Sequence, residues 1–191
     1  GAKDNVVTLP RRDRPAPADA TAPADNSATV EAKLRGLAGG NAALGNGLVE
    51  VWRADRSFDP EAFVRGAKQA YEMVVTAFAE GNRNILKGLL SRDVFESFSS
   101  VITEREAAGH AVEQKFGISE AELAEAGVRQ GVAQVAIRFV SDLISVTRDK
   151  SGAVVAGDAK RTQQVIDIWT FARETSSPDP NWKLVATESP G

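Results

Sequence analysis

The sequence has no cysteine and only one histidine among its 191 residues. Without cysteine the chain cannot form disulfides, use thiol catalysis, or hold cysteine-ligated zinc or iron–sulfur clusters. A single histidine excludes metal motifs built on two histidines and argues against a histidine-based catalytic triad. We therefore predict no metal site, no cofactor and no set of catalytic residues in this chain.

The sequence also lacks an excess of charge of one sign and lacks long apolar runs. It has 23 basic and 26 acidic side chains, which gives a formal net charge of −3. Dedicated nucleic-acid-binding proteins usually carry a strong basic excess, so we expect no nucleic-acid partner. The longest apolar runs extend over only a few residues, which excludes a transmembrane helix within this sequence.

Large aromatic residues are scarce in the first part of the chain. All eight Phe and the single Tyr lie beyond residue 57. A segment with so few large apolar groups cannot bury enough surface to offset the entropy lost on ordering. We therefore expect residues 1–56 to be a flexible, Ala/Pro-rich linker with marginal helices near 29–37 and 44–54, where glycines interrupt the apolar positions. One folded domain is expected over 57–188.

Strong helical signals begin at Asp59 and Pro60, a good N-cap followed by a residue that fits the first helical position. Apolar residues then recur at helical spacing until Gly81, and two further stretches with the same period lie near 85–90 and 91–109. The stripe of the first helix consists of Phe63, Ala67, Ala70, Tyr71, Val74 and Phe78. Three successive amphipathic helices need an apolar surface to pack against.

Strand-like segments follow at 132–147, 165–171 and 182–187, each rich in β-branched or aromatic residues and separated by turn residues. Helices first and strands afterwards predict an α+β fold, with the helices packed on one face of an antiparallel sheet. Residues 112–130 are ambiguous. Ser119 and the glutamate three positions later match a capping box, so local propensity alone favours a helix there.

Four separated segments carry a family resemblance: 57–63 (SFDPEAF), 137–149 (IRFVSDLISVTRD), 167–171 (DIWTF) and 179–187 (DPNWKLVAT). In this order and spacing they resemble the Tim44-like domain family, the C-terminal domain of subunit forty-four of the mitochondrial inner-membrane translocase. The resemblance implies a fold similar to nuclear transport factor two (NTF2), in which helices on a curved antiparallel sheet form a cone with a pocket. It also implies that 112–130 is a long strand, because tertiary pairing can override local propensity.

The resemblance implies a function as well. The mitochondrial relatives tether the import motor's chaperone at the inner-membrane channel and bind anionic lipid. We therefore expect a non-enzymatic, membrane-tethered scaffold whose partners are inner-membrane lipid and membrane or chaperone proteins. The Ala, Arg and Gly usage suggests a bacterial member. Because the chain starts at Gly1 and not at Met, we expect an N-terminal anchor upstream and a location on the cytoplasmic face of a bacterial inner membrane.

Six aromatic side chains are the candidate lining of a lipid-binding pocket: Tyr71, Phe95, Phe98, Phe116, Trp169 and Phe171. Ordinary core packing is the alternative. Both faces of the strand at 165–171 are apolar, which favours a pocket on one face or a homodimer interface on the other. Arg11, Arg12 and Arg14 are candidate contacts to anionic lipid headgroups near a membrane, and a solvated linker is the alternative.

Two other functions are open at this stage. An enzyme on the same fold would use Asp167 or His110 as a general base. Otherwise Asp167 is structural and pairs with Arg138 or another strand arginine, and His110 is a surface residue at a helix end. A chaperone-like binder of unfolded or membrane proteins would instead present an open apolar surface.

Overall fold

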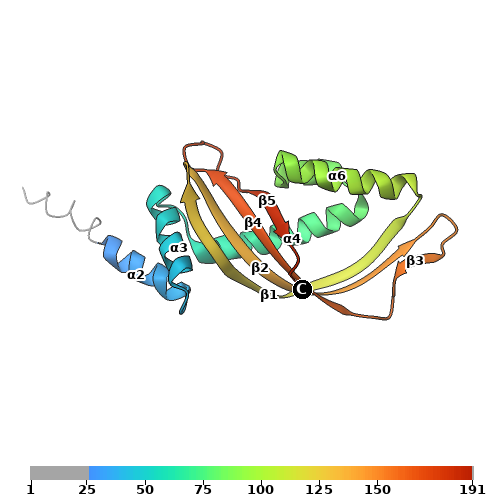
Figure 1. The fold of residues 1–191 in the computed structure, drawn as a ribbon, viewed down its shortest axis with the longest axis horizontal. Helices are drawn as coiled ribbons and strands as arrows, with labels where there is room; N and C mark the ends of the chain where they lie inside the picture. Colours follow the sequence, from blue (N-terminus) through green and yellow to red (C-terminus); the bar gives the residue numbers. More distant parts are fainter. Residues whose placement is uncertain (1–25, 191) are drawn as a thin grey trace, which may run out of the picture.

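The structure is a computed structural model that describes residues 26–190, and this part of the chain forms five helices followed by five strands (Figure 1). The helices are α2 (Ser27–Leu37), α3 (Ala42–Ala54), α4 (Pro60–Glu80), α5 (Arg83–Leu89) and α6 (Arg92–Ala107). The strands are β1 (Ala111–Arg129), β2 (Val132–Arg148), β3 (Val154–Gly157), β4 (Gln163–Glu174) and β5 (Lys183–Glu188). This order confirms the predicted α+β class.

The strands form one antiparallel sheet in the order β1-β2-β4-β5, and the short β3 pairs with the end of β2. Two register shifts in β1, after Ile118 and after Leu123, are irregularities of the kind that bend a strand. Figure 1 shows α4 crossing the sheet, with α2 and α3 at the end where β1 finishes. The helices therefore cover one face of the sheet, which we call the inner face.

The three strongly predicted helices are confirmed, and local signals explain where they begin and end. Asp59 accepts hydrogen bonds from the backbone N–H groups of Glu61 and Ala62, which caps the start of α4. Gly81 ends this helix in the left-handed conformation, at φ 74°, that glycine adopts at little cost. Asn82 and Ser91 cap the starts of α5 and α6 in the same way as Asp59.

The ambiguous segment is a strand, as the resemblance implies and against its local propensity. β1 pairs with β2 from Ala111, opposite Arg148, to Arg129, opposite Val132. This pairing satisfies the backbone of β1 along one edge and places every second side chain against the core. If the same residues formed a helix, the backbone groups of β2 that face β1 would have no partner. Tertiary pairing therefore decides the conformation.

Packing extends upstream of residue 57, where we expected the folded domain to begin. The helices expected near 29–37 and 44–54 are α2 and α3, and several of their apolar side chains belong to the core: Leu34, Leu44, Leu48, Val49, Val51 and Trp52. Glycine explains the difference. A side chain at Gly47 would overlap the carbonyl oxygen of Ala126, so glycine is what lets α3 approach β1 this closely.

One hydrophobic core lies between the helices and the inner face of the sheet. On β2 and β4 every second residue points inward, and Ile137 lies opposite Trp169 while Phe139 lies opposite Asp167. Ile137 and Phe139 are fully buried. Asp167 therefore shares the inner face with large apolar groups, as its spacing in the sequence suggests.

Candidate functional site

Tyr71 of α4 lies at the centre of a cluster of rings on the inner face. Its ring centroid is 4.4 Å from that of Phe139, 4.6 Å from that of Trp169 and 6.3 Å from that of Phe116. Tyr71 is only 3% exposed. We call these four residues the buried tyrosine cluster. Such close ring packing fills the space between α4 and the sheet, so the cluster is part of the core.

The hydroxyl group of Tyr71 joins three elements through hydrogen bonds. It donates to a carboxylate oxygen of Asp167 on β4 at 2.8 Å, and it lies 3.0 Å from the hydroxyl oxygen of Ser141 on β2. The hydroxyl group of Ser189 donates to the other carboxylate oxygen of Asp167 at 3.1 Å. Asp167 therefore accepts hydrogen bonds from two hydroxyl groups. Arg138, one of the partners expected for it, forms an ion pair with Glu120 instead.

Burial raises the pKa of the Tyr71 hydroxyl well above its usual range, and the neighbouring Asp167 carboxylate adds to the rise. The folded state therefore keeps a proton that the unfolded chain loses above about pH 10. A group whose pKa is raised by folding stabilises the fold fully below its unfolded pKa. We expect this contribution to decline as the pH rises above about 10.

This behaviour can be measured cleanly because Tyr71 is the single tyrosine of the chain. The near-ultraviolet absorbance of tyrosinate monitors this titration, and we expect the tyrosine of the denatured chain to titrate near pH 10. The folded chain should show no tyrosinate until it unfolds. A folded chain that titrates together with the denatured one would contradict the buried hydrogen-bonded hydroxyl.

A separate hollow of about 490 Å³ lies between α4, the end of β4 and the loop that leads into β5. Its large side chains are Phe58, Phe63, Phe171 and Trp182, and we call it the aromatic pocket. Phe63 contacts both Trp182 and Phe171 edge-on, with centroids 4.9 Å and 5.9 Å away. The four rings come from three separate stretches of sequence, and the fold brings them to one hollow.

The mouth of the aromatic pocket is polar. Arg173 of β4 pairs with Asp55 at 3.2 Å and donates to the carbonyl oxygens of Ser177 and Asp179. Hydrogen bonds from Ser57, assisted by the charge of Arg173, lower the pKa of the Asp55 carboxyl, although burial acts against them. This ion pair is therefore charged at neutral pH and ties the α3–α4 connection to the β4–β5 turn.

The structure places four of the six predicted pocket residues in these two regions and the other two elsewhere in the core. Phe171 lines the aromatic pocket, whereas Tyr71, Phe116 and Trp169 belong to the buried tyrosine cluster. Phe98 packs against Phe78, and Phe95 packs against the core. Our prediction missed Phe58, Phe63 and Trp182 as pocket residues. Phe63 lies in the predicted apolar stripe of α4, but no local pattern links it to Trp182.

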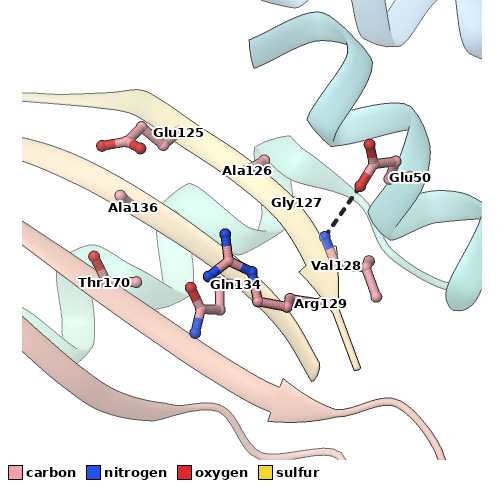
Figure 2. A pocket seen from close by; sticks show the side chains of 9 residues that line it. All are labelled: Glu50, Glu125, Ala126, Gly127, Val128, Arg129, Gln134, Ala136 and Thr170. Atoms are coloured by element: carbon pink, nitrogen blue, oxygen red, sulfur yellow. Dashed lines mark hydrogen bonds between the residues drawn. The ribbon is translucent and has the colours of Figure 1, made fainter. Parts of the chain in front are cut away.

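A second, more polar hollow of about 370 Å³ lies beside the end of β1 (Figure 2). Glu50 of α3 reaches β1 here, and its carboxylate accepts a hydrogen bond from the backbone N–H of Val128 at 3.2 Å. Figure 2 shows Arg129 and Gln134 on neighbouring strands beside this contact. Because Glu50 occupies a free N–H group of an edge strand, it secures α3 against β1.

The other candidate residues are not brought into one site. His110 lies where α6 meets β1. Hydrogen bonds from Ser151 and Ala153 lower the pKa of the Asp149 carboxyl, and His110 makes a smaller contribution in the same direction. Arg11, Arg12 and Arg14 lie outside the described residues. Within residues 26–190, no three acidic or histidine side chains converge as a metal site requires. In the same range no helix is both long and apolar enough to cross a bilayer.

The family model of the Tim44-like domain matches residues 44–189 of this chain. The human mitochondrial import inner membrane translocase subunit TIM44 is 24% identical over 142 residues, which cover 72% of this chain and 31% of the human protein. A probable counterpart from Caenorhabditis elegans, tin-44, is 22% identical over 82% of this chain and 38% of its own length. The chain thus spans about a third of the length of these relatives.

Solved structures similar to this chain include an NTF2-like superfamily protein from Salmonella enterica, at 10% identity and a TM-score of 0.45. It matches 70% of this chain and 93% of its own length. The intermembrane-space region of the chloroplast protein ARC6 is 11% identical and has the same TM-score, over 66% of this chain and 95% of that region.

Proposed function

This chain belongs to the Tim44-like domain family, and from that premise we propose that it is a non-enzymatic scaffold domain that works at a membrane and binds a lipid or protein partner. The observation that carries the proposal is the family match over 44–189, which spans most of the described fold. The relatives it matches are named as subunits of a mitochondrial inner-membrane import translocase. We propose for this chain the cytoplasmic face of a bacterial inner membrane.

The aromatic pocket supports partner binding, because it is the kind of largely apolar hollow with a few polar groups that binding sites use. Of the six aromatic residues we proposed for this role, Phe171 lies directly on its wall. Tyr71 and Trp169 are 3% and 5% exposed, so they would act on a partner indirectly, by holding the shape of the inner face.

A general base at Asp167 is less well supported than the scaffold role. Both of its carboxylate oxygens accept hydrogen bonds from protein hydroxyl groups, those of Tyr71 and Ser189. A general base must instead reach a proton on the substrate. His110 lies beside Asp149 at the junction of α6 and β1, away from the residues that line the aromatic pocket.

Vesicle flotation combined with crosslinking in native membranes tests the proposal. We expect the full protein to float with vesicles that contain anionic lipid, or to crosslink to a membrane or chaperone protein. Flotation that increases with the anionic fraction would indicate the lipid, because charged headgroups attract basic side chains. Vesicles of zwitterionic lipid alone are the control. Absence of both flotation and crosslinked partners would contradict the scaffold role.

A further inference from the structure

Several side chains of α4 that line the aromatic pocket are small, which leaves room in the hollow. Ala62, Gly66, Ala67 and Ala70 of α4 line it together with the rings of Phe171 and Trp182. A Cβ atom at Gly66 would meet no atom within 4 Å. Glycine inside a helix costs about 1 kcal/mol relative to alanine, so it is unfavourable for the helix itself. Gly66 is exposed and has open space beside it, in a hollow that aromatic rings also line, and such a hollow can accept an inserted apolar side chain.

The charged groups at the mouth of the aromatic pocket differ in how fully their charges are already paired within the protein. The Arg173 side chain is 13% exposed and already bonded to the Asp55 carboxylate and to two backbone carbonyl oxygens. It therefore has little capacity left for an anionic ligand. Asp59 caps α4 through one carboxylate oxygen, Oδ1, which accepts from two backbone N–H groups. The capping N–H groups carry no formal charge, so Asp59 keeps a net negative charge beside the hollow and favours a cation there.

We propose that the aromatic pocket binds a protein segment in which an apolar side chain is flanked by lysine or arginine. The apolar side chain would insert between Gly66 and Trp182, and the neighbouring cation would lie against Asp59. An anionic lipid headgroup would instead meet Asp59 and the occupied Arg173, which makes it the less favoured occupant. The inference rests on the proposed function, because it names the class of partner that the scaffold holds.

Two short peptides with the same Leu-Leu-Phe centre provide the probes, one flanked by lysines and the other by glutamates. We expect calorimetric titration to show that the lysine peptide binds more tightly, by about tenfold at low salt. Added salt should reduce the difference, because the contact to the rim is exposed and is screened. Equal affinity of the two peptides, or preference for the glutamate peptide, would overturn the inference.

Three variants locate the binding. Gly66→Leu should fill the hollow and weaken binding of the lysine peptide by about tenfold. Gly36→Leu is the matched control, because a Cβ atom at Gly36 also meets nothing within 4 Å. Asp59→Asn should weaken binding of the lysine peptide by about threefold. Asparagine caps helices as well as aspartate does, so α4 is retained. Thermal unfolding of each variant verifies the fold, and unchanged affinity in folded Gly66→Leu would overturn the inference.

Anionic phosphatidylglycerol vesicles separate this inference from the proposed function. If Gly66→Leu abolishes vesicle binding and neither peptide binds the wild-type protein, the pocket is a lipid site. The inference is then wrong, while the scaffold function stands. Failure of the proposed function has a different signature, in which the wild-type protein neither floats with vesicles nor crosslinks to a membrane or chaperone protein.

Discussion

Replacing Gly47 by alanine is expected to lower the free energy of unfolding by about 3 kcal/mol, the upper part of the range for overpacked sites. The new Cβ atom would overlap the carbonyl oxygen of Ala126, a backbone atom of β1 that cannot rotate away. Either α3 or β1 must then shift, and the burial of Leu48 and Val51 beside them is lost. Chemical denaturation, monitored by circular dichroism, measures the change in the free energy of unfolding.

Gly36→Ala is the matched control for this prediction. A Cβ atom at Gly36 meets nothing within 4 Å, so alanine there should raise stability by about 0.5–1 kcal/mol through its better helix propensity. The two substitutions are chemically identical and differ only in what lies beside the glycine. If both raised stability equally, α3 would not be packed against β1, and the domain would begin closer to residue 57.

Replacing Tyr71 by phenylalanine is expected to cost about 2 kcal/mol, because it removes the partner of buried polar groups while leaving the ring packing intact. The hydroxyl oxygen of Ser141 would lose its bond to Tyr71 at a site that is 2% exposed. The Asp167 carboxylate would also lose a donor at 2.8 Å. Urea denaturation of the variant and the wild type measures the difference in the free energy of unfolding.

A double-mutant cycle with Ser141→Ala separates the hydrogen bond from other effects. We expect the double variant to lose less stability than the sum of the two single variants, because removing both partners leaves no unpaired hydroxyl group between them. Strict additivity would show that the contact between Tyr71 and Ser141 contributes nothing. Since Tyr71 lies outside the aromatic pocket, the lysine peptide should bind the folded Tyr71→Phe variant normally.

The two regions therefore separate stability from binding. The buried tyrosine cluster is filled by its own rings and holds α4 against the sheet. The aromatic pocket keeps open space at Gly66 and a charged rim. Substitutions in the first region should change unfolding, whereas substitutions that fill the second should change binding in a folded protein.

The helices from α4 to α6 could be predicted from the sequence because their signals are local. Asp59 and Ser91 cap backbone N–H groups two or three residues away, and Gly81 ends α4 through its own φ angle. The inward position of Asp167 likewise followed from alternation along one strand. Each of these features depends on residues within about one helical turn or one strand, which a short stretch of sequence contains.

The sequence by itself thus determined the α+β class and, through four separated segments, the family. The strand β1 was implied by the family resemblance and not by local propensity, whereas only the tertiary structure decided that α3 joins the core and that the hollow lies beside Trp182. In each case the deciding contact joins residues far apart in the chain: β1 with β2, Gly47 with Ala126, and Phe63 with Trp182. Local propensity cannot report such contacts, because their energy exists only once the chain has brought the partners together.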